Sequence, residues 1–321
     1  MQRSAYSKRR VTRPKSRFDA VRTFHLGVLD GNRCLDGDDR NQWILPGASR
    51  EQHHQHAARG RAHKLQQRRI RDGLLKTAFR AELQFGRHEE RVRKFDEAVR
   101  VFVDNHGAPA RTADIAAIVN DIRARVHHLD LAVTADRKDA NVVVILVPRR
   151  DFARTVRSRY GESAAKKIEN SLHPECLSGI AKDRSYRIRR AEVILPVDAE
   201  EFQFCDCAYE ELLQSLGLIN DDSSVPWTMF NDDVQMGFFD VYDQYLANIL
   251  YDPRIRPGMT KGEVDALLPD VFETVRAWVA HANSVKGENA RDGLDVDERN
   301  GAAPSTTSAV YSQYTEPQRR R

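Results

Sequence analysis

The sequence predicts an α/β (α+β) fold, in which a twisted mixed sheet with an antiparallel edge strand is followed by a buried helix and C-terminal helices. Three observations support this prediction. Segments with strand periodicity alternate with helical segments over residues 70–172. Residues 142–147 are entirely apolar, as expected of a strand that is covered on both faces. A hairpin pattern then precedes a helix that ends in Leu-Gly-Leu at residues 216–218.

Charge divides the chain of 321 residues into unlike parts. Residues 1–67 hold 14 Lys and Arg against 6 Asp and Glu, whereas the remainder holds 37 basic and 41 acidic residues. The first segment lacks sustained periodicity and is predicted to be a disordered basic tail. A basic arm that touches nucleic acid or an anionic membrane is an alternative. A start codon assigned too far upstream is another.

The predicted folded domain spans residues 68–283, and residues 284–321 are predicted to be a disordered tail because they lack aliphatic periodicity. The domain is mildly acidic, so its composition gives no indication of nucleic-acid binding. No run of apolar residues is long enough for a transmembrane helix.

Hydrophobic spacing gives the elements of the first half of the domain in order. Thr112 is a candidate N-cap for the second helix. The predicted elements are a helix at 70–85, strands at 99–105, 129–134 and 141–148, and helices at 111–128 and 152–172.

The second half is predicted to begin with a hairpin whose arms, 177–181 and 186–196, meet across residues 182–184. A helix from residue 237 ends at Pro253, because proline cannot continue it. Thr260 and Glu263 have the spacing of a capping box, which starts a helix. A last helix is predicted at residues 271–282.

The helix between these parts, called the motif helix here, carries a recognisable pattern. From Glu210 the chain reads E-E-L-L-Q-S-L-G-L-I-N-D, and Met229 follows in a turn. This resembles the active-site segment of matrixin-type zinc proteases, H-E-L-G-H-x-L-G-L-x-H-S, which precedes a methionine-containing turn. The resemblance implies a zincin-like fold with Glu211 at the general-base position and Met229 below the metal. Glu210, Gln214 and Asn220 stand in place of the three zinc-binding histidines.

These replacements argue against zinc chemistry. Glu210 and Gln214 are four residues apart and project from one helix face, and Gly217 turns the chain toward Asn220. One carboxylate and two amide oxygens suit hard cations, whereas zinc favours imidazole and thiolate. We therefore expect no bound metal and no cofactor. Without metal-activated water, catalysis by Glu211 is doubtful.

Glu210 and Gln214 are instead expected to form a hydrogen-bonded network that clips the motif helix to the Asn220 loop. Arg187, Arg189 and Arg190 on the preceding strand are candidate partners for Glu210, because a buried carboxylate needs a partner.

The four cysteines allow two interpretations, a disulfide or free thiols. Cys176 is able to pair with Cys205 or with Cys207 in an oxidising compartment. Free buried thiols are the alternative.

A second resemblance covers residues 70–272. The phrases IRDGLLKTAF, VRVFVDN, ANVVVILV, CAYEELLQSLGL, MFNDD and LYDPRIRPGM are similar to those of an uncharacterised proteobacterial family described as lipoproteins or secreted proteins. The resemblance implies a zincin-like domain in the cell envelope, periplasmic or secreted, which fits a disulfide at Cys176. The N-terminus shows no apolar signal region, so a cytoplasmic protein is the alternative.

Together these features predict a metalloprotease-like domain that lacks its zinc ligands. We expect it to bind a peptide or protein partner in the cleft between the edge strand and the motif helix, since an edge strand accepts an extended peptide by β-addition. A metal-dependent peptidase with oxygen ligands and a structural envelope protein are the two alternatives.

Overall fold

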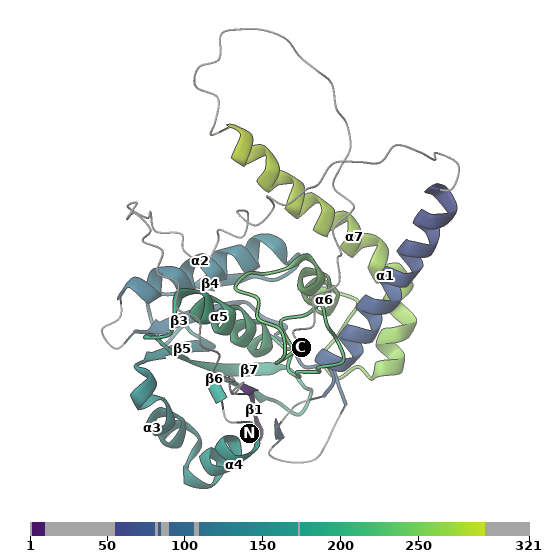
Figure 1. Cartoon of the computed structure of the whole chain (residues 1–321). Helices are drawn as coiled ribbons and strands as arrows, with labels where there is room; N and C mark the ends of the chain where they lie inside the picture. The colour runs from purple at the N-terminus through teal and green to yellow at the C-terminus, as the bar shows by residue number, and fades with distance from the viewer. Residues whose placement is uncertain are drawn as a thin grey trace, which may run out of the picture.

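A computed structural model describes residues 2–9, 55–80, 83–84, 90–105, 109–172 and 174–292. Side chains are described for residues 66–80, 90–105, 111–170 and 174–284. The predicted α/β fold with a mixed sheet, an antiparallel edge and C-terminal helices is confirmed (Figure 1).

The sheet has the strand order β2-β1-β6-β7-β5-β3-β4. Strands β4, β3, β5 and β7 run parallel to one another. Beyond β7, strands β6, β1 and β2 continue the sheet with antiparallel pairs. The strands are β1 (Gln2–Arg9), β2 (Leu83–Gln84), β3 (Val99–Asp104), β4 (Leu131–Val133), β5 (Val142–Val147), β6 (Pro174–Lys182) and β7 (Ile188–Pro196).

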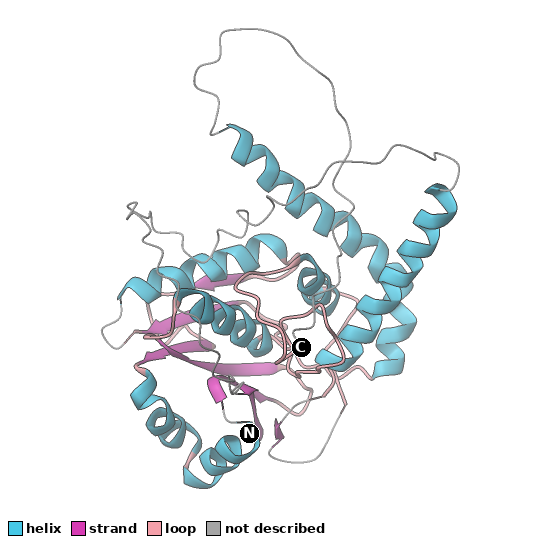
Figure 2. Ribbon diagram, in the orientation of Figure 1, coloured by secondary structure: helices cyan, strands magenta, loops and turns pink. Residues whose placement is uncertain are grey.

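Helices cover both faces of this sheet, and Figure 2 shows the two layers. Helices α3 and α4 lie on one face, while the motif helix, α5, packs on the other face together with the remaining helices. The helices are α1 (Gln55–Thr77), α2 (Pro109–Arg125), α3 (Arg149–Tyr160), α4 (Glu162–Leu172), α5 (Glu201–Ser215), α6 (Val241–Tyr251) and α7 (Lys261–Asp292).

Strand β5 shows why its sequence is apolar throughout. Val142, Val144 and Leu146 point into the larger core, beneath α2 and α5. Ile145 and Val147 point into the smaller core, beneath α3 and α4. Because successive side chains of a strand face opposite ways, both of its faces need apolar residues.

The structure differs from the predicted elements at three places. The first helix ends at Thr77 rather than at residue 85. The single helix predicted over 152–172 is divided into α3 and α4 at Gly161, whose φ of 80° a helix cannot continue. The two predicted C-terminal helices form one helix, α7, despite Pro269 inside it.

Helix α7 tolerates this proline because one face of it is buried from Val264 to Val279. Val264, Leu268, Val271, Val275 and Val279 all belong to the larger core. Its predicted capping box is confirmed, since Thr260 N–H donates to Glu263 Oε2 (2.8 Å) and Glu263 N–H donates back to Thr260 Oγ1 (3.2 Å).

The segment predicted to be a tail, residues 1–67, contributes β1 and the first part of α1. The stretches 10–54 and 293–321 lie outside the described residues. Among the helices that the structure describes, we find none with the length and apolar character needed to cross a membrane.

Candidate functional site

Helix α5 lies at the centre of the domain. It contacts β1, β6 and β7 on the sheet side and α2 beside it. Every residue from Phe204 to Ser215 is buried, including Glu210, Glu211 and Gln214, each with 0% exposure. Burying ionisable and amide groups costs free energy unless they are hydrogen-bonded or paired, so these side chains are candidates for function.

Gly217 ends α5 as the sequence predicts. Leu218 N–H donates to Leu213 O and Gly217 N–H donates to Gln214 O, the two bonds of a Schellman-type cap. Gly217 has φ 125°, a conformation that favours glycine. Tyr251 Oη donates to Leu216 O (2.8 Å) and fixes this end to α6.

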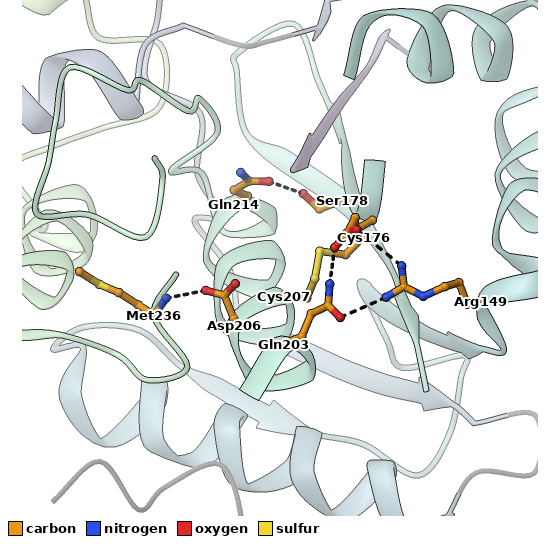
Figure 3. Close-up of a disulfide and its surroundings, with 9 residues drawn as sticks. Arg149, Cys176, Ser178, Gln203, Asp206, Cys207, Gln214 and Met236 are labelled. Atoms are coloured by element: carbon orange, nitrogen blue, oxygen red, sulfur yellow. Dashed lines mark hydrogen bonds and ion pairs between the residues drawn. A yellow bond between two sulfur atoms is a disulfide. The ribbon is translucent and has the colours of Figure 1, made fainter. Parts of the chain in front are cut away.

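Gln214 connects strand β6 to the loop that follows α5. Its Oε1 accepts a hydrogen bond from Ser178 Oγ on β6 (3.1 Å), as Figure 3 shows. Its Nε2 donates to Asp221 Oδ1 (2.9 Å). Gln214 therefore links the motif helix to this loop, and it does so through Asp221.

Asn220, the predicted third ligand position, makes different contacts. Its Nδ2 donates to Lys76 O and to Asp221 O, and its N–H donates to Thr77 O. Its side chain thus holds the end of α1. The loop after Gly217 turns the next residue, Asp221, toward Gln214.

Three carboxylates meet beside this clip. Glu210, Asp221 and Asp232 each place an oxygen within 4.8 Å of the others. They come from α5, from the loop after it and from the turn after Met229. In the part of the chain that the structure describes, these three residues form the group of His, Cys, Asp or Glu side chains close enough together to hold a metal ion. A set of carboxylate oxygens suits calcium, magnesium or manganese rather than zinc.

The arginines that precede the motif helix have other partners. Arg187 pairs with Asp96 (2.6 Å), and Arg189 pairs with Asp183 (3.0 Å) and Glu97 (3.4 Å). Arg190 is exposed. The predicted pairing of these arginines with Glu210 is therefore wrong for Arg187 and Arg189, since β7 directs them to the loop residues beside its start.

Met229 is fully buried in the turn below α5. Its N–H donates to Asp243 Oδ2 (3.1 Å), and Thr228 Oγ1 donates to Asp243 Oδ1 (2.6 Å). Asp243, on α6, therefore fixes the turn that also carries Asp232. No local pattern marks Asp243 beyond its place within a mostly apolar helix.

Burial raises the pKa of the Asp243 carboxyl to about 8, and the nearby Asp240 and Glu210 act in the same direction. The folded protein thus holds a proton that an unfolded Asp releases near pH 4. This stabilisation is complete below about pH 4 and is lost as pH rises through about 8.

We expect the difference in unfolding free energy between wild type and Asp243→Asn to change by up to about 1.4 kcal/mol per pH unit between about pH 4 and pH 8, in favour of the variant as pH rises. Asn keeps the shape and has no proton to lose. Urea unfolding at each pH measures this difference. A difference that stays constant with pH would show that Asp243 does not hold the proton.

A disulfide joins α5 to strand β6 of the sheet. Cys176 on β6 is bonded to Cys207, with a Cα–Cα distance of 6.0 Å, and both residues are buried. This is one of the two pairings that the sequence left open. Cys205 is also disulfide-bonded.

Polar contacts surround this disulfide (Figure 3). Gln203 Nε2 donates to Glu175 beside Cys176, and Arg149 donates to Gln203 Oε1 (3.2 Å). On the other side of α5, Met236 N–H donates to Asp206 Oδ1 (2.7 Å). Helix α5 is thus held to β6 by one covalent bond and to its neighbours by several hydrogen bonds.

A family model described as "Protein of unknown function (DUF2927)" matches residues 67–270. The chain belongs to the DUF2927 family. The family region contains α5, the carboxylate group, the Met229 turn and both cysteines of the described disulfide, whereas β1 and the second half of α7 lie outside it. Comparisons with curated proteins and with solved structures found no match.

Proposed function

We propose that the DUF2927 domain is a zincin-like, protein-binding domain of the cell envelope that works without zinc catalysis. It takes up an extended peptide strand along β6, beside α5. One observation carries this proposal: β1, from outside the family region, pairs antiparallel with β6 from Gln2↔Lys182 to Arg9↔Pro174.

The surroundings of β1 are those of a peptide slot. Strand β6 pairs with it on one side, and β2, part of the family region, pairs with it on the other at Ser4↔Gln84 and Ala5↔Leu83. Helix α5 also contacts β1. Backbone hydrogen bonds on both sides give a peptide affinity with little demand on its side chains. The N-terminal strand is then the occupant that the chain itself supplies.

The chemistry of α5 favours binding over hydrolysis. Glu210 and Gln214 supply oxygen and amide groups where the matrixin pattern has histidines, and Asn220 is engaged with α1. The buried Cys176–Cys207 disulfide supports an oxidising compartment, periplasmic or extracellular, because cytosolic thiols are kept reduced.

The proposal is tested with a variant that lacks residues 1–9 and a synthetic peptide of residues 1–10. We expect the peptide to bind the truncated protein at least about tenfold more tightly than the full chain, because the tethered strand competes at high effective concentration. Isothermal titration calorimetry measures both affinities.

Proline-substituted peptides are the matched controls. In a slot with strands on both sides, proline at Ser4 and proline at Ala5 should each weaken binding, because each removes a backbone N–H from one side. A truncated protein that stays folded and binds none of these peptides would contradict the proposal.

A second candidate function is a metal-dependent peptidase with oxygen ligands, favoured by the approach of Glu210, Asp221 and Asp232 to within 4.8 Å. It predicts that Ca²⁺ or Mn²⁺ at ten times its Kd raises the unfolding free energy by about 1.4 kcal/mol. Asp232→Asn should remove this gain, while Asp233→Asn, at the exposed neighbouring position, should keep it. Equal gains in both variants, or no gain in wild type, would exclude this candidate.

A further inference from the structure

The turn after α2, the turn after α6 and the middle of α7 line an open surface pocket of about 500 Å³. Its lining includes His127, His128, Arg254, Trp278 and His281. These residues belong to elements other than β6, β2 and α5, so this pocket is separate from the proposed peptide slot. A pocket of this volume holds a small organic molecule.

Aromatic rings line the pocket in a row. His127 and Trp278 are stacked, with ring centroids 4.2 Å apart and planes 12° apart. His128 extends the row from His127 (3.7 Å), and His281 extends it from Trp278 (5.7 Å). Such a wall favours ligands with a flat aromatic ring, which stack or pack edge to face on it.

The row is fixed before any ligand arrives. Trp278 Nε1 donates to Arg125 O (3.0 Å), which also accepts from Asn248 Nδ2 (2.8 Å). Asn248 Oδ1 in turn accepts a hydrogen bond from the backbone N–H of His127 (2.8 Å). The same side chain thus holds α6 to the end of α2, and a rigid pocket loses little entropy when it binds.

Imidazole rings supply most of the hydrogen-bonding groups left over in the pocket, and each neutral ring carries one N–H donor and one acceptor nitrogen. The ring nitrogens of His127, His128 and His281 donate to no other residue of the described chain. The one carboxylate in the lining, Asp252, is already held by Arg254 through two bonds of 2.7 and 2.6 Å. A carboxylate ligand therefore has imidazole N–H donors available at the pocket, while the lining carboxylate is already engaged.

Positive charge lies behind these donors. Lys94 Nζ donates to the carbonyl oxygens of Leu250 (2.8 Å), Asp252 (3.3 Å) and Ile255 (2.7 Å), directly beneath the turn that carries Arg254. Two cationic groups, Arg254 in the lining and Lys94 behind it, thus accompany the single carboxylate of the lining, Asp252. An anion is thus favoured over a neutral or cationic ligand of the same shape.

We propose that this pocket is a binding site for a small planar aromatic anion, of the aryl carboxylate class. The ring lies against the row formed by His127 and Trp278, and its carboxylate accepts hydrogen bonds from the histidine N–H groups. This inference is independent of the proposed peptide slot, and its failure would leave that proposal unaffected.

The test uses the full chain and three naphthalene probes: 1-naphthoate, the neutral 1-naphthalenemethanol and the cationic 1-naphthylmethylamine. We expect saturable binding of one 1-naphthoate per chain, with affinity about tenfold above that of the neutral probe and higher still relative to the cation. Isothermal titration calorimetry gives stoichiometry and affinity.

Two variants locate the site. His128→Asn removes the imidazole but keeps a residue type that tolerates its φ of 61°, and Trp278→Leu removes the central ring. Each should weaken 1-naphthoate binding by about tenfold. The matched control Trp227→Leu, outside this pocket, should leave the affinity within about twofold.

Unsaturable binding, equal affinity for the cationic probe, or unchanged affinity in a folded His128→Asn protein would each overturn the proposal. His128→Asn keeps the test decisive if Trp278→Leu fails to fold, since near-UV circular dichroism identifies a folded variant.

Discussion

Replacing Gly217 by alanine is expected to destabilise the domain by at least about 3 kcal/mol, the largest loss that we predict for a single substitution. A Cβ at this position would lie 2.1 Å from the carbonyl oxygen of Arg93 and 3.1 Å from Leu250 Cδ2. The carbonyl belongs to the backbone, so it has little freedom to move away. The φ of 125° adds further strain for any residue with a side chain.

Gly262→Ala is the matched control, because nothing lies within 4 Å of a Cβ there and the residue is helical in α7. We expect this change to be neutral or to stabilise by up to about 1 kcal/mol. Urea unfolding compares both variants with wild type. A Gly217→Ala protein within 1 kcal/mol of wild type would mean that the end of α5 is not packed against Arg93 as described.

Removal of the disulfide in the double variant Cys176→Ala, Cys207→Ala is expected to cost about 3 to 4 kcal/mol. The bond closes a loop across a sequence separation of 31 residues, so breaking it gives the unfolded chain more freedom. Both side chains are also buried against β6 and α5, and their loss leaves a small void. Urea unfolding under non-reducing conditions measures the loss.

The same variant links stability to function. Because Cys176 lies on β6 and Cys207 on α5, the disulfide fixes two of the elements that contact β1. We therefore expect weaker peptide binding at the proposed slot in the folded double variant. Reductant added to this variant reports the contribution of the Cys205 bond alone. A loss below 1 kcal/mol would show that the disulfide adds little to this fold.

Local signals in the sequence predicted much of the domain. The apolar run of β5 predicted a strand covered on both faces, and Thr260 with Glu263 predicted the start of α7. Leu-Gly-Leu predicted the end of α5 at Gly217, because few residues other than glycine adopt its φ. In each case residues close in the sequence determine the structure.

The candidate site was predicted less completely, because its contacts join distant residues. Asp221 takes the position expected of Asn220, since the path of the loop after Gly217 depends on packing against α1. Asp243 reaches the Met229 turn from the next helix. The pairing of β1 with β6 joins segments about 170 residues apart. No local pattern in residues 2–9 predicts that this strand pairs with β6.

The most direct test of the proposed peptide slot is amide hydrogen exchange along β6, residues 174–182. It is measured in the full chain and in the variant that lacks residues 1–9. In the full chain we expect protection at the amides that face β7 and also at those that face β1. Truncation should remove protection only from the second set, and adding the peptide of residues 1–10 should restore it. Identical protection in both proteins, with no change on adding the peptide, would contradict the account of β6 as a strand-accepting edge.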